Sequence, residues 1–162
     1  MAKPLMCPPE VLQRDLGGRR VIVTGANSGI GFVTAKQLAK QGASVTLACR
    51  REAEGQEKAN EIRADVADAD LEVRALDLGK LSSVREFADK YLADHESLHV
   101  LINNAGIMNT PKRKTVDGFE SQIGVNHLGH FLLTELLLDT LKQSAPSRVV
   151  VVSSCYHDKA MG

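Results

Sequence analysis

Three glycines with a short, fixed spacing form the part of this sequence best suited to bind phosphate. Gly25, Gly29 and Gly31 lie within residues 24–31, between a β-rich run and a segment of helical periodicity. In such a turn the first glycine permits a tight reversal, the second lets the backbone approach a pyrophosphate, and the third allows close packing of a helix whose first N–H groups lack partners. The turn predicts a dinucleotide site, and an ordinary flexible turn is the alternative. The residues expected to contact the dinucleotide are Gly25, Asn27, Ser28, Gly29, Ile30 and Gly31.

Two arginines follow the second β-rich run, near the position where a dinucleotide-binding fold usually places an acid. That acid accepts hydrogen bonds from the ribose hydroxyls of NAD(H), but Cys49 stands there, and Arg50 and Arg51 come next. A guanidinium suits the 2′-phosphate of NADP(H) because it forms paired, charge-assisted hydrogen bonds. Arg50 therefore predicts NADP(H) as the cofactor, unless both arginines only solvate the start of an acidic helix.

The elements that must position these residues alternate along the chain from Arg20 onward. Short β-rich runs, apolar on both faces, are separated by segments of helical periodicity, and no repeat interrupts them. Strands covered on both faces are typical of a parallel sheet with crossover helices, and right-handed crossovers give a doubly wound, Rossmann-type α/β fold. The predicted strands are Arg20–Thr24, Ser44–Ala48, Leu71–Leu76, His99–Asn103 and Arg148–Val152.

The sequence signals that mark the ends of the predicted helices differ from one helix to the next. The first follows the glycine turn and stops near Gly42, a charged second helix covers about residues 51–67, and a long helix covers residues 117 to about 143. Ser83, with Glu86 three residues later, has the spacing of a capping box and predicts the start of the third helix. The apolar face of that helix consists of Val84, Phe87, Ala88, Tyr91 and Leu92.

Composition narrows the class of protein. The 162 residues suit one domain, which we assign to residues 19–162 after an N-terminal extension of residues 1–18. The 20 basic and 20 acidic residues cancel, so there is no general field to attract nucleic acid or an anionic membrane. No apolar run reaches the ~18 to 20 residues of a membrane span, and 3 widely spaced cysteines argue against a disulfide framework or a zinc site. We expect a cytoplasmic protein, with membrane association through regions outside this chain as the alternative.

Motifs in and after these elements resemble the short-chain dehydrogenase/reductase family. The turn reads Thr-Gly-x-x-x-Gly-x-Gly, Asn-Asn-Ala-Gly occupies residues 103–106, Val-Asn-His-Leu-Gly-His residues 125–130, and Ser-Ser residues 153–154. Longer segments, among them residues 26–31, 101–108 and 117–142, look like the retinol dehydrogenase branch, and this resemblance covers about residues 15–154. The resemblance implies hydride transfer between NADP(H) and a small lipophilic alcohol or carbonyl such as retinol or retinal.

The same resemblance implies further contacts to the cofactor. In the family the Asp-Leu after the third strand borders the adenine, which corresponds to Asp77 and Leu78 here. A turn-capping carboxylate is the alternative for Asp77. Asn103 is expected to tie strands together. The residues implied to lie beside the cofactor's ribose are Asn104, Ala105 and Gly106.

Two side chains would take part in the reaction itself. Asn126 falls on the helical row that holds Ile123 and His130, so the periodicity predicts that it faces inward, where an amide needs partners. Family members use this asparagine to bind a water of the proton relay, and a satisfied core amide is the alternative. Ser154 matches the family serine whose hydroxyl holds the substrate oxygen, unless it only satisfies backbone groups at a strand end. The two histidines of this helix lack a metal-binding pattern and are interpreted as structural.

The family's proton donor has no match in this sequence. Its chemistry uses Tyr-x-x-x-Lys, in which the tyrosine exchanges a proton with the substrate oxygen and the lysine lowers the tyrosine's pKa. The tyrosines here are Tyr91 and Tyr156, and His95 and Ala160 stand four residues beyond them. Lys159, three residues beyond Tyr156, is rejected as the partner. We therefore expect a C-terminally truncated fold that binds cofactor and is inactive alone; a non-catalytic isoform that sequesters NADP(H) or pairs with a full-length partner is the alternative.

The fifth β-rich run carries one more expectation. In the family a helix after this strand packs on the sheet and commonly forms half of the dimer contact, so the complete protein would form a homo-oligomer. Without that helix, Val149–Val152 would be a partly uncovered apolar strand, which invites association.

Overall fold

The computed structural model describes residues 7–154 and contains one parallel sheet with the strand order β3-β2-β1-β4-β5. This order confirms the predicted doubly wound α/β fold. The strands are β1 (Arg20–Thr24), β2 (Ser44–Cys49), β3 (Leu71–Ala75), β4 (Val100–Asn103) and β5 (Arg148–Val151). The helices are α1 (Gly29–Lys40), α2 (Glu52–Asp65), α3 (Leu81–Asp94), α4 (Ser121–Ile123) and α5 (Gly129–Gln143), with a π-helical turn, η1 (Gly124–Leu128), between the last two.

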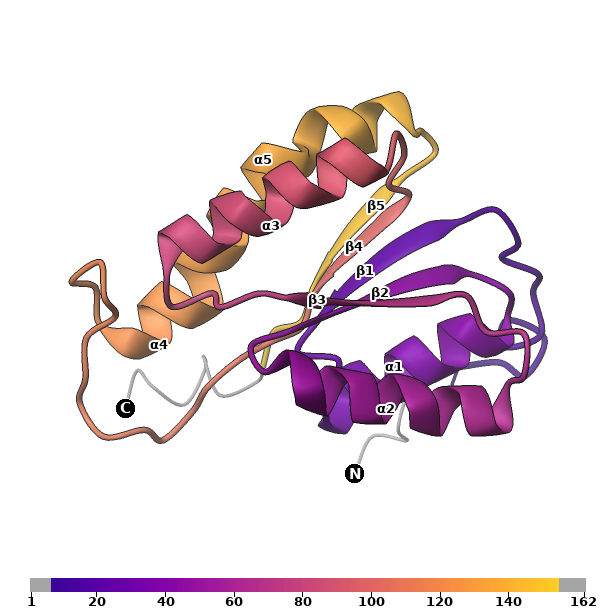
Figure 1. The fold of residues 1–162 in the computed structure, drawn as a ribbon, viewed down its shortest axis with the longest axis horizontal. Coiled ribbons are helices and arrows are strands. Elements are labelled where there is room, and N and C mark those ends of the chain that lie inside the picture. The colour runs from indigo at the N-terminus through magenta and orange to yellow at the C-terminus, as the bar shows by residue number, and fades with distance from the viewer. Residues whose placement is uncertain (1–6, 155–162) are drawn as a thin grey trace.

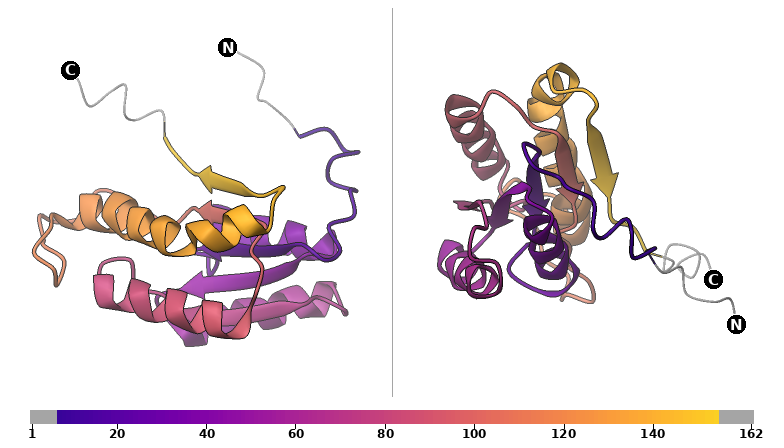
Figure 2. Two further views of the ribbon diagram at one scale, coloured as in Figure 1. Left: turned by 90° about the horizontal axis from the view of Figure 1, so that it is seen from above. Right: turned by 90° about the vertical axis from the view of Figure 1, so that its right-hand side faces the viewer.

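The helices lie in two layers, one on each face of the sheet (Figures 1 and 2). α1 and α2 cover one face, and α3 and α5 cover the other. The chain runs outward from β1 to β2 and β3, then returns to place β4 on the other side of β1. The direction of winding therefore reverses between β1 and β4, and in open α/β sheets ligands bind beside the carboxyl ends of the strands at such a point.

Two apolar cores hold these layers together, because neighbouring residues of β1 point to opposite faces of the sheet. Val21 and Val23 pack with the small residues of α1 and α2, whereas Ile22 packs with α3 and α5. The second core includes Phe87 and Tyr91, both at most 2% exposed. Strands buried on both faces explain the continuous apolar runs in the sequence.

The start of α3 differs from the predicted capping box. The helix begins at Leu81 after the N-cap residue Lys80, whose own side chain does not cap it, and the carboxylate of Asp117 accepts from the backbone N–H of Leu81 at 2.9 Å. Ser83 Oγ instead accepts a hydrogen bond from the backbone N–H of Asp77 at 3.0 Å, so this hydroxyl fixes the preceding loop. The predicted apolar face is buried except for Leu92, which is 40% exposed at the rim.

The predicted long helix starts at Ser121 rather than at Asp117. The side chain of Glu120 caps it by accepting from the N–H groups of Gln122 and Ile123, both at 2.9 Å. The π-helical turn η1 then inserts extra backbone before α5 and changes the phase of the helix. As a result Ile123 is 51% exposed, so a single helical row over this segment is wrong.

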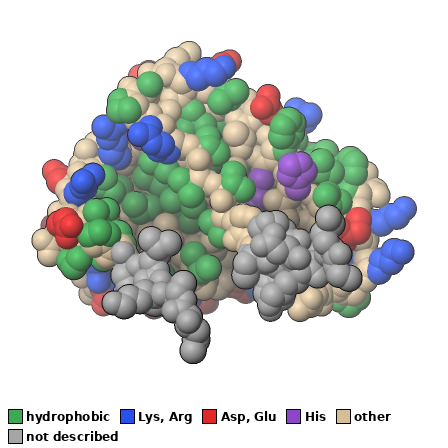
Figure 3. Space-filling model, turned by 180° about the vertical axis from the view of Figure 1, so that it is seen from behind, with side chains coloured by type: hydrophobic (Ala, Val, Ile, Leu, Met, Phe, Trp, Pro, Cys, Tyr) green, Lys and Arg blue, Asp and Glu red, His purple; other side chains and the backbone are tan. Residues whose placement is uncertain are grey.

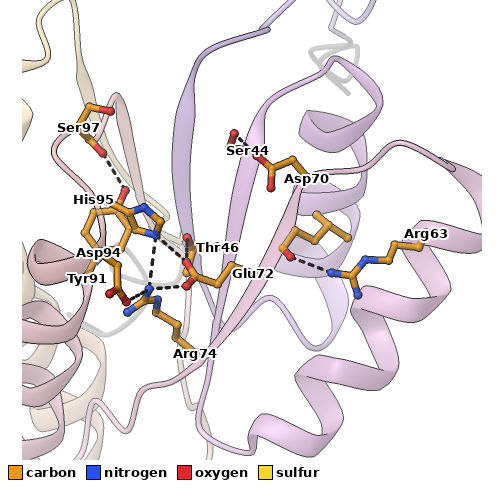
Figure 4. Close-up of polar contacts among 11 residues, drawn as sticks. Ser44, Thr46, Arg63, Asp70, Glu72, Arg74, Tyr91, Asp94, His95 and Ser97 are labelled. Carbon is orange, nitrogen blue, oxygen red and sulfur yellow. Dashed lines mark hydrogen bonds and ion pairs between the residues drawn. The ribbon is translucent and has the colours of Figure 1, made fainter.

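The β3 edge of the sheet carries a cluster of charged side chains (Figure 4). Arg74 forms ion pairs with Glu72 and with Asp94, the second at 2.6 Å, and His95 Nε2 lies 3.0 Å from Glu72. Burial alone would raise the pKa of Glu72, but the bonds from Arg74 and His95 outweigh it and lower that pKa below its ordinary value. Charged side chains at this edge disfavour pairing of β3 with a strand of another chain, which is a common feature of edge strands.

The β5 side of the sheet is different. Seen from behind, the surface shows an extended hydrophobic area around this strand (Figure 3). The side chains of Val149 and Val151 are 40% and 66% exposed, which agrees with the expected uncovered strand. None of the helices within residues 7–154 is both long and apolar enough to span a membrane.

Candidate cofactor site

A cleft of about 370 Å³ lies at the carboxyl ends of the strands, where the winding of the sheet reverses. All of the predicted cofactor contacts except Gly31 line it. They are Gly25, Asn27, Ser28, Gly29, Ile30, Arg50, Asp77, Leu78, Asn104, Ala105 and Gly106. Arg51 and Ile107 also line it, and neither was among the predicted contacts.

The glycine turn has the backbone geometry that its residues permit. Gly25 and Gly29 have φ of +67° and +52°, in the left-handed region that favours glycine. A Cβ at Gly31 would lie 2.5 Å from the carbonyl oxygen of Gly25 and 2.5 Å from Asn104 Nδ2, so this position needs glycine for close approach. The approach is between the turn and the loop after β4. Nothing lies within 4 Å of a Cβ built at Gly29, which therefore borders open space.

The first turn of α1 faces the cleft with unpaired donors. Ser28 is the N-cap residue, and its side chain makes no capping hydrogen bond. No acidic side chain lies in this first turn. A helix N-terminus carries partial positive charge and free N–H groups, which favour an anion such as a pyrophosphate.

Thr24 joins the turn to the second half of the sheet through one hydroxyl group. Its Oγ1 accepts from the N–H groups of Asn104 and Ala105, both at 2.9 Å, and lies 2.9 Å from His130 Nε2. His130 Nδ1 lies 3.1 Å from the carbonyl of Asn126, which can only accept, so Nδ1 donates there and Nε2 accepts from Thr24. Burial lowers the pKa of His130, which favours this neutral form. Sequence reasoning missed this pair, although it interpreted the histidine as structural.

The two asparagines at the end of β4, Asn103 and Asn104, have different partners from those expected. Asn104 Nδ2 donates to the carbonyl of Thr24 at 2.8 Å, so Asn104 is the residue that ties β4 to β1. Asn103 Nδ2 donates to Thr134 Oγ1 at 2.9 Å and fixes the strand to α5. Asn104 still lines the cleft, as do Ala105 and Gly106.

Arg50 is the cleft's unpaired cation. Within residues 7–154 its side chain makes no hydrogen bond or ion pair, and it is exposed at the rim of the cleft. Cys49 lies beneath it, 1% exposed, and burial raises the pKa of its thiol to about 11. The residue in the usual acid position therefore carries no negative charge near neutral pH.

Asp77 has the contact of a turn-capping carboxylate. Its Oδ1 accepts from the N–H of Gly79 at 2.9 Å, which is the alternative interpretation of this residue. It also lines the cleft beside Leu78, so the turn contact and a place next to the cofactor are compatible.

Asn126 does not face inward as predicted but is exposed, because η1 changes the phase of the helix. Its amide is nevertheless engaged: Oδ1 accepts from the N–H of Ile107 at 2.9 Å, and Nδ2 donates to the carbonyl of Ile107 at 2.9 Å. The side chain thus holds the wall of the cleft after β4. A π-helical turn at such a position is common near functional sites.

Known proteins resemble this chain in sequence and in fold. A model of the short chain dehydrogenase family matches residues 19–161. The chain belongs to the short-chain dehydrogenase/reductase family. It is 58% identical to human retinol dehydrogenase 11 and 56% identical to mouse retinol dehydrogenase 12, over 143 residues that cover 88% of this chain and 45% of each relative. The chain therefore spans about half the length of the curated relatives it matches.

Solved structures of the family have the same fold. An uncharacterised protein from Mycobacterium paratuberculosis superimposes with a TM-score of 0.77 at 50% identity, over 90% of this chain and 49% of that one. The NADP active-site complex of Pseudomonas aeruginosa RhlG superimposes with a TM-score of 0.72 at 29% identity, over 83% and 54%. The similarity to retinol dehydrogenases confirms the branch indicated by the motifs.

The family's reacting groups are only partly represented in the described residues. Ser154 follows β5 and is exposed, but it does not line the cleft. Tyr91 is buried in the second core, where its hydroxyl donates to the carbonyl of Ser97 at 3.0 Å and burial raises its pKa to about 12. It is therefore unsuited to exchange protons with a substrate. Tyr156 and Lys159 lie outside the described residues.

Proposed function

We propose that this chain binds NADP(H) in the cleft at the carboxyl ends of its strands. The observation that carries the proposal is Arg50, a cleft-lining guanidinium without a partner within residues 7–154, next to a neutral Cys49. A 2′-phosphate would give Arg50 an anionic partner, whereas a ribose hydroxyl pair would leave its charge uncompensated. The NADP complex of the related RhlG structure also supports this choice.

The remaining cleft residues fit the rest of a dinucleotide. The cradle formed by Gly25, Gly31 and Asn104, into which no Cβ fits at Gly31, would bring the backbone close to the pyrophosphate. The free N–H groups of α1 would donate to its oxygens. Asp77 and Leu78 would border the adenine, and Ala105 and Gly106 the ribose.

For the complete protein we propose reversible oxidoreduction of a lipophilic alcohol or carbonyl, because the relatives are named retinol dehydrogenases. NADP(H) would supply or accept the hydride at its nicotinamide ring. Asn126 would keep the wall at Ile107 in place and could hold a water, and Ser154 would position the substrate oxygen. For the 162-residue chain alone we propose cofactor binding without efficient turnover, because Tyr91 is committed to the core. Sequestration of NADP(H) would follow from the same property.

Calorimetric titration of the purified chain with NADPH and NADH tests the cofactor. We expect tighter binding of NADPH, and roughly 10-fold weaker NADPH binding in Arg50→Ala, because charge-assisted hydrogen bonds contribute about 1.5–3 kcal/mol before solvent exposure reduces them. NADH binding should stay within about two-fold. Arg148→Ala, which removes the same charge at the opposite end of the sheet, is the matched control. Equal affinities for both cofactors, or an unchanged preference in Arg50→Ala, would contradict the proposal.

A further inference from the structure

Glu54 connects the glycine turn to the second arginine of the cleft. One carboxylate oxygen, Oε2, accepts from Asn27 Nδ2 at 2.9 Å, and the other, Oε1, pairs with Arg51 Nε at 2.7 Å. Both Asn27 and Arg51 line the cleft, whereas Glu54 stands behind them in the first turn of α2. A single acid thus engages both residues that flank the proposed phosphate site.

This contact gives the two neighbouring arginines different roles. Arg51 pairs with the Glu54 carboxylate through its Nε at 2.7 Å. Arg50 has no such partner among the described residues. Both residues line the cleft, but of the two it is Arg51 that pairs with the Glu54 carboxylate.

Other acid–base pairs on the same helix lack this arrangement. Lys58 and Glu61 also pair at a spacing of three residues, at 2.6 Å, but neither lines the cleft. The Glu54 pair is distinguished by its third partner, Asn27, which belongs to the phosphate-binding turn.

We propose that Glu54 is a positioning residue that limits the selectivity of the cleft for NADP(H). Its carboxylate holds Arg51 back from the 2′-phosphate site and cancels its charge, so Arg50 is left as the phosphate-binding guanidinium. Removal of the carboxylate releases Arg51 as a second phosphate ligand. This inference rests on the proposed function, because it presupposes that NADPH binds beside Arg50.

Glu54→Gln is the appropriate variant, because the glutamine oxygen still accepts from Asn27 while the negative charge is lost. We expect NADPH to bind roughly 3- to 10-fold more tightly, since a second guanidinium then faces a dianion at the protein surface. NADH binding should change by less than about two-fold, and the gain should shrink in about 0.5 M salt because screening weakens exposed charges. Glu57→Gln, one turn along α2 and away from the cleft, is the matched control with the same change in charge.

A double-mutant cycle then separates release of Arg51 from a general change in charge. In the natural sequence, Arg51→Gln should weaken NADPH binding by less than about three-fold. In the Glu54→Gln background, the same substitution should weaken NADPH binding roughly 10-fold relative to Glu54→Gln alone. Calorimetric titrations of the four proteins with NADPH and NADH supply the comparison, and circular dichroism checks that each is folded.

The possible outcomes are distinct. Unchanged or weaker NADPH binding in Glu54→Gln, an equal gain for NADH, an equal gain in Glu57→Gln, or an Arg51→Gln effect of the same size in both backgrounds would overturn the role of Glu54. If Glu54→Gln does not fold, a loss greater than about three-fold in Arg51→Gln alone would overturn it, because a neutralised arginine cannot contribute that much. If the natural sequence binds no NADPH, the proposed function fails first.

Discussion

The two halves of the sheet differ in how many of their side chains are packed or paired with other residues. In the half formed by β1, β2 and β3, the glycine turn is fixed by close contacts and the charges at the β3 edge are paired. In the half formed by β4 and β5, the valines of β5 are exposed and the segment that carries Asn126 contains a π-helical turn. The proposed contacts to the 2′-phosphate and the pyrophosphate lie in the first half. Asn126 and Ser154, the residues proposed for the reaction, lie in the second. The difference suggests that binding and chemistry can be separated in this chain.

The largest expected effect concerns turnover. The 162-residue polypeptide, saturated with NADPH, should reduce retinal and alkyl aldehydes at least about 100-fold more slowly than human retinol dehydrogenase 11, because general acid catalysis contributes roughly 10²- to 10⁴-fold. Tyr91 cannot supply the proton, since its hydroxyl is buried and bonded to Ser97. Loss of NADPH absorbance measures the rate, with Ser154→Ala as the control. Fast turnover that disappears in Ser154→Ala would end the separation of binding from chemistry and direct attention to Tyr156 and Lys159.

The second prediction tests the first half of the sheet. Gly29→Val should lower NADPH affinity below detection, because the new side chain would enter the open space that the pyrophosphate is proposed to occupy. The left-handed φ of +52° adds strain, which destabilises a non-glycine residue by about 1–2 kcal/mol. Calorimetry measures binding, and urea denaturation measures the free energy of unfolding.

Gly118→Val is a close control for this variant. Gly118 also has a left-handed φ, +88°, and nothing within 4 Å of a built Cβ, but it does not line the cleft. It should lose a similar amount of stability and keep its NADPH affinity. If the folded Gly29→Val protein binds NADPH normally, or if Gly118→Val loses binding to the same degree, the proposed phosphate turn is wrong.

The smallest expected effect concerns pH and the β3 edge. Because the pKa of Glu72 is lower in the folded protein than its ordinary value of 4.5, its ionised form stabilises the fold. This contribution is present above about pH 4.5 and is lost as the pH falls through the folded pKa. Glu72→Gln should therefore reduce the free energy of unfolding near pH 7 by less than about 1 kcal/mol, since the pair is partly exposed.

Urea denaturation at several pH values from 3 to 7 would give the free energy of unfolding as a function of pH. The slope of this curve should differ between the natural protein and Glu72→Gln. The difference should narrow as the pH falls below about 4.5. Glu57→Gln, which changes an exposed acid of α2 outside this cluster, serves as the control. Parallel pH curves for the natural protein and Glu72→Gln would show that the β3 edge is not held by this carboxylate.

The strands and the glycine turn could be predicted because local pattern and tertiary structure agree there. Apolar runs such as Arg20–Thr24 are buried on both faces, and only glycine suits the φ of Gly25. The capping box failed because Ser83 bonds to a loop six residues earlier, a contact that spacing alone does not reveal. The burial of Asn126 failed because a π-helical turn breaks the period of 3.6 residues without an obvious sequence signal.

The Glu54 contact was also outside the reach of the sequence. An acid three residues after an arginine is an ordinary helix pair, and only the fold brings Asn27 to the same carboxylate. By contrast, the position of Arg50 at the cleft could be predicted, because a short, regular βαβ unit sets the place of the residue that follows its second strand. The position of a residue within the β1–α1–β2 unit was therefore predictable, whereas the contact between the glycine turn of that unit and α2 was not.

The hydroxyl of Thr24 has a consequence for the entropy of binding. Two consecutive amide groups, those of Asn104 and Ala105, already donate to it, and its own proton is fixed by His130. The loop after β4 is therefore ordered before any ligand arrives, and its amide hydrogens should exchange slowly with solvent. Binding at this wall requires no further loss of backbone freedom, so contacts made there translate more fully into affinity.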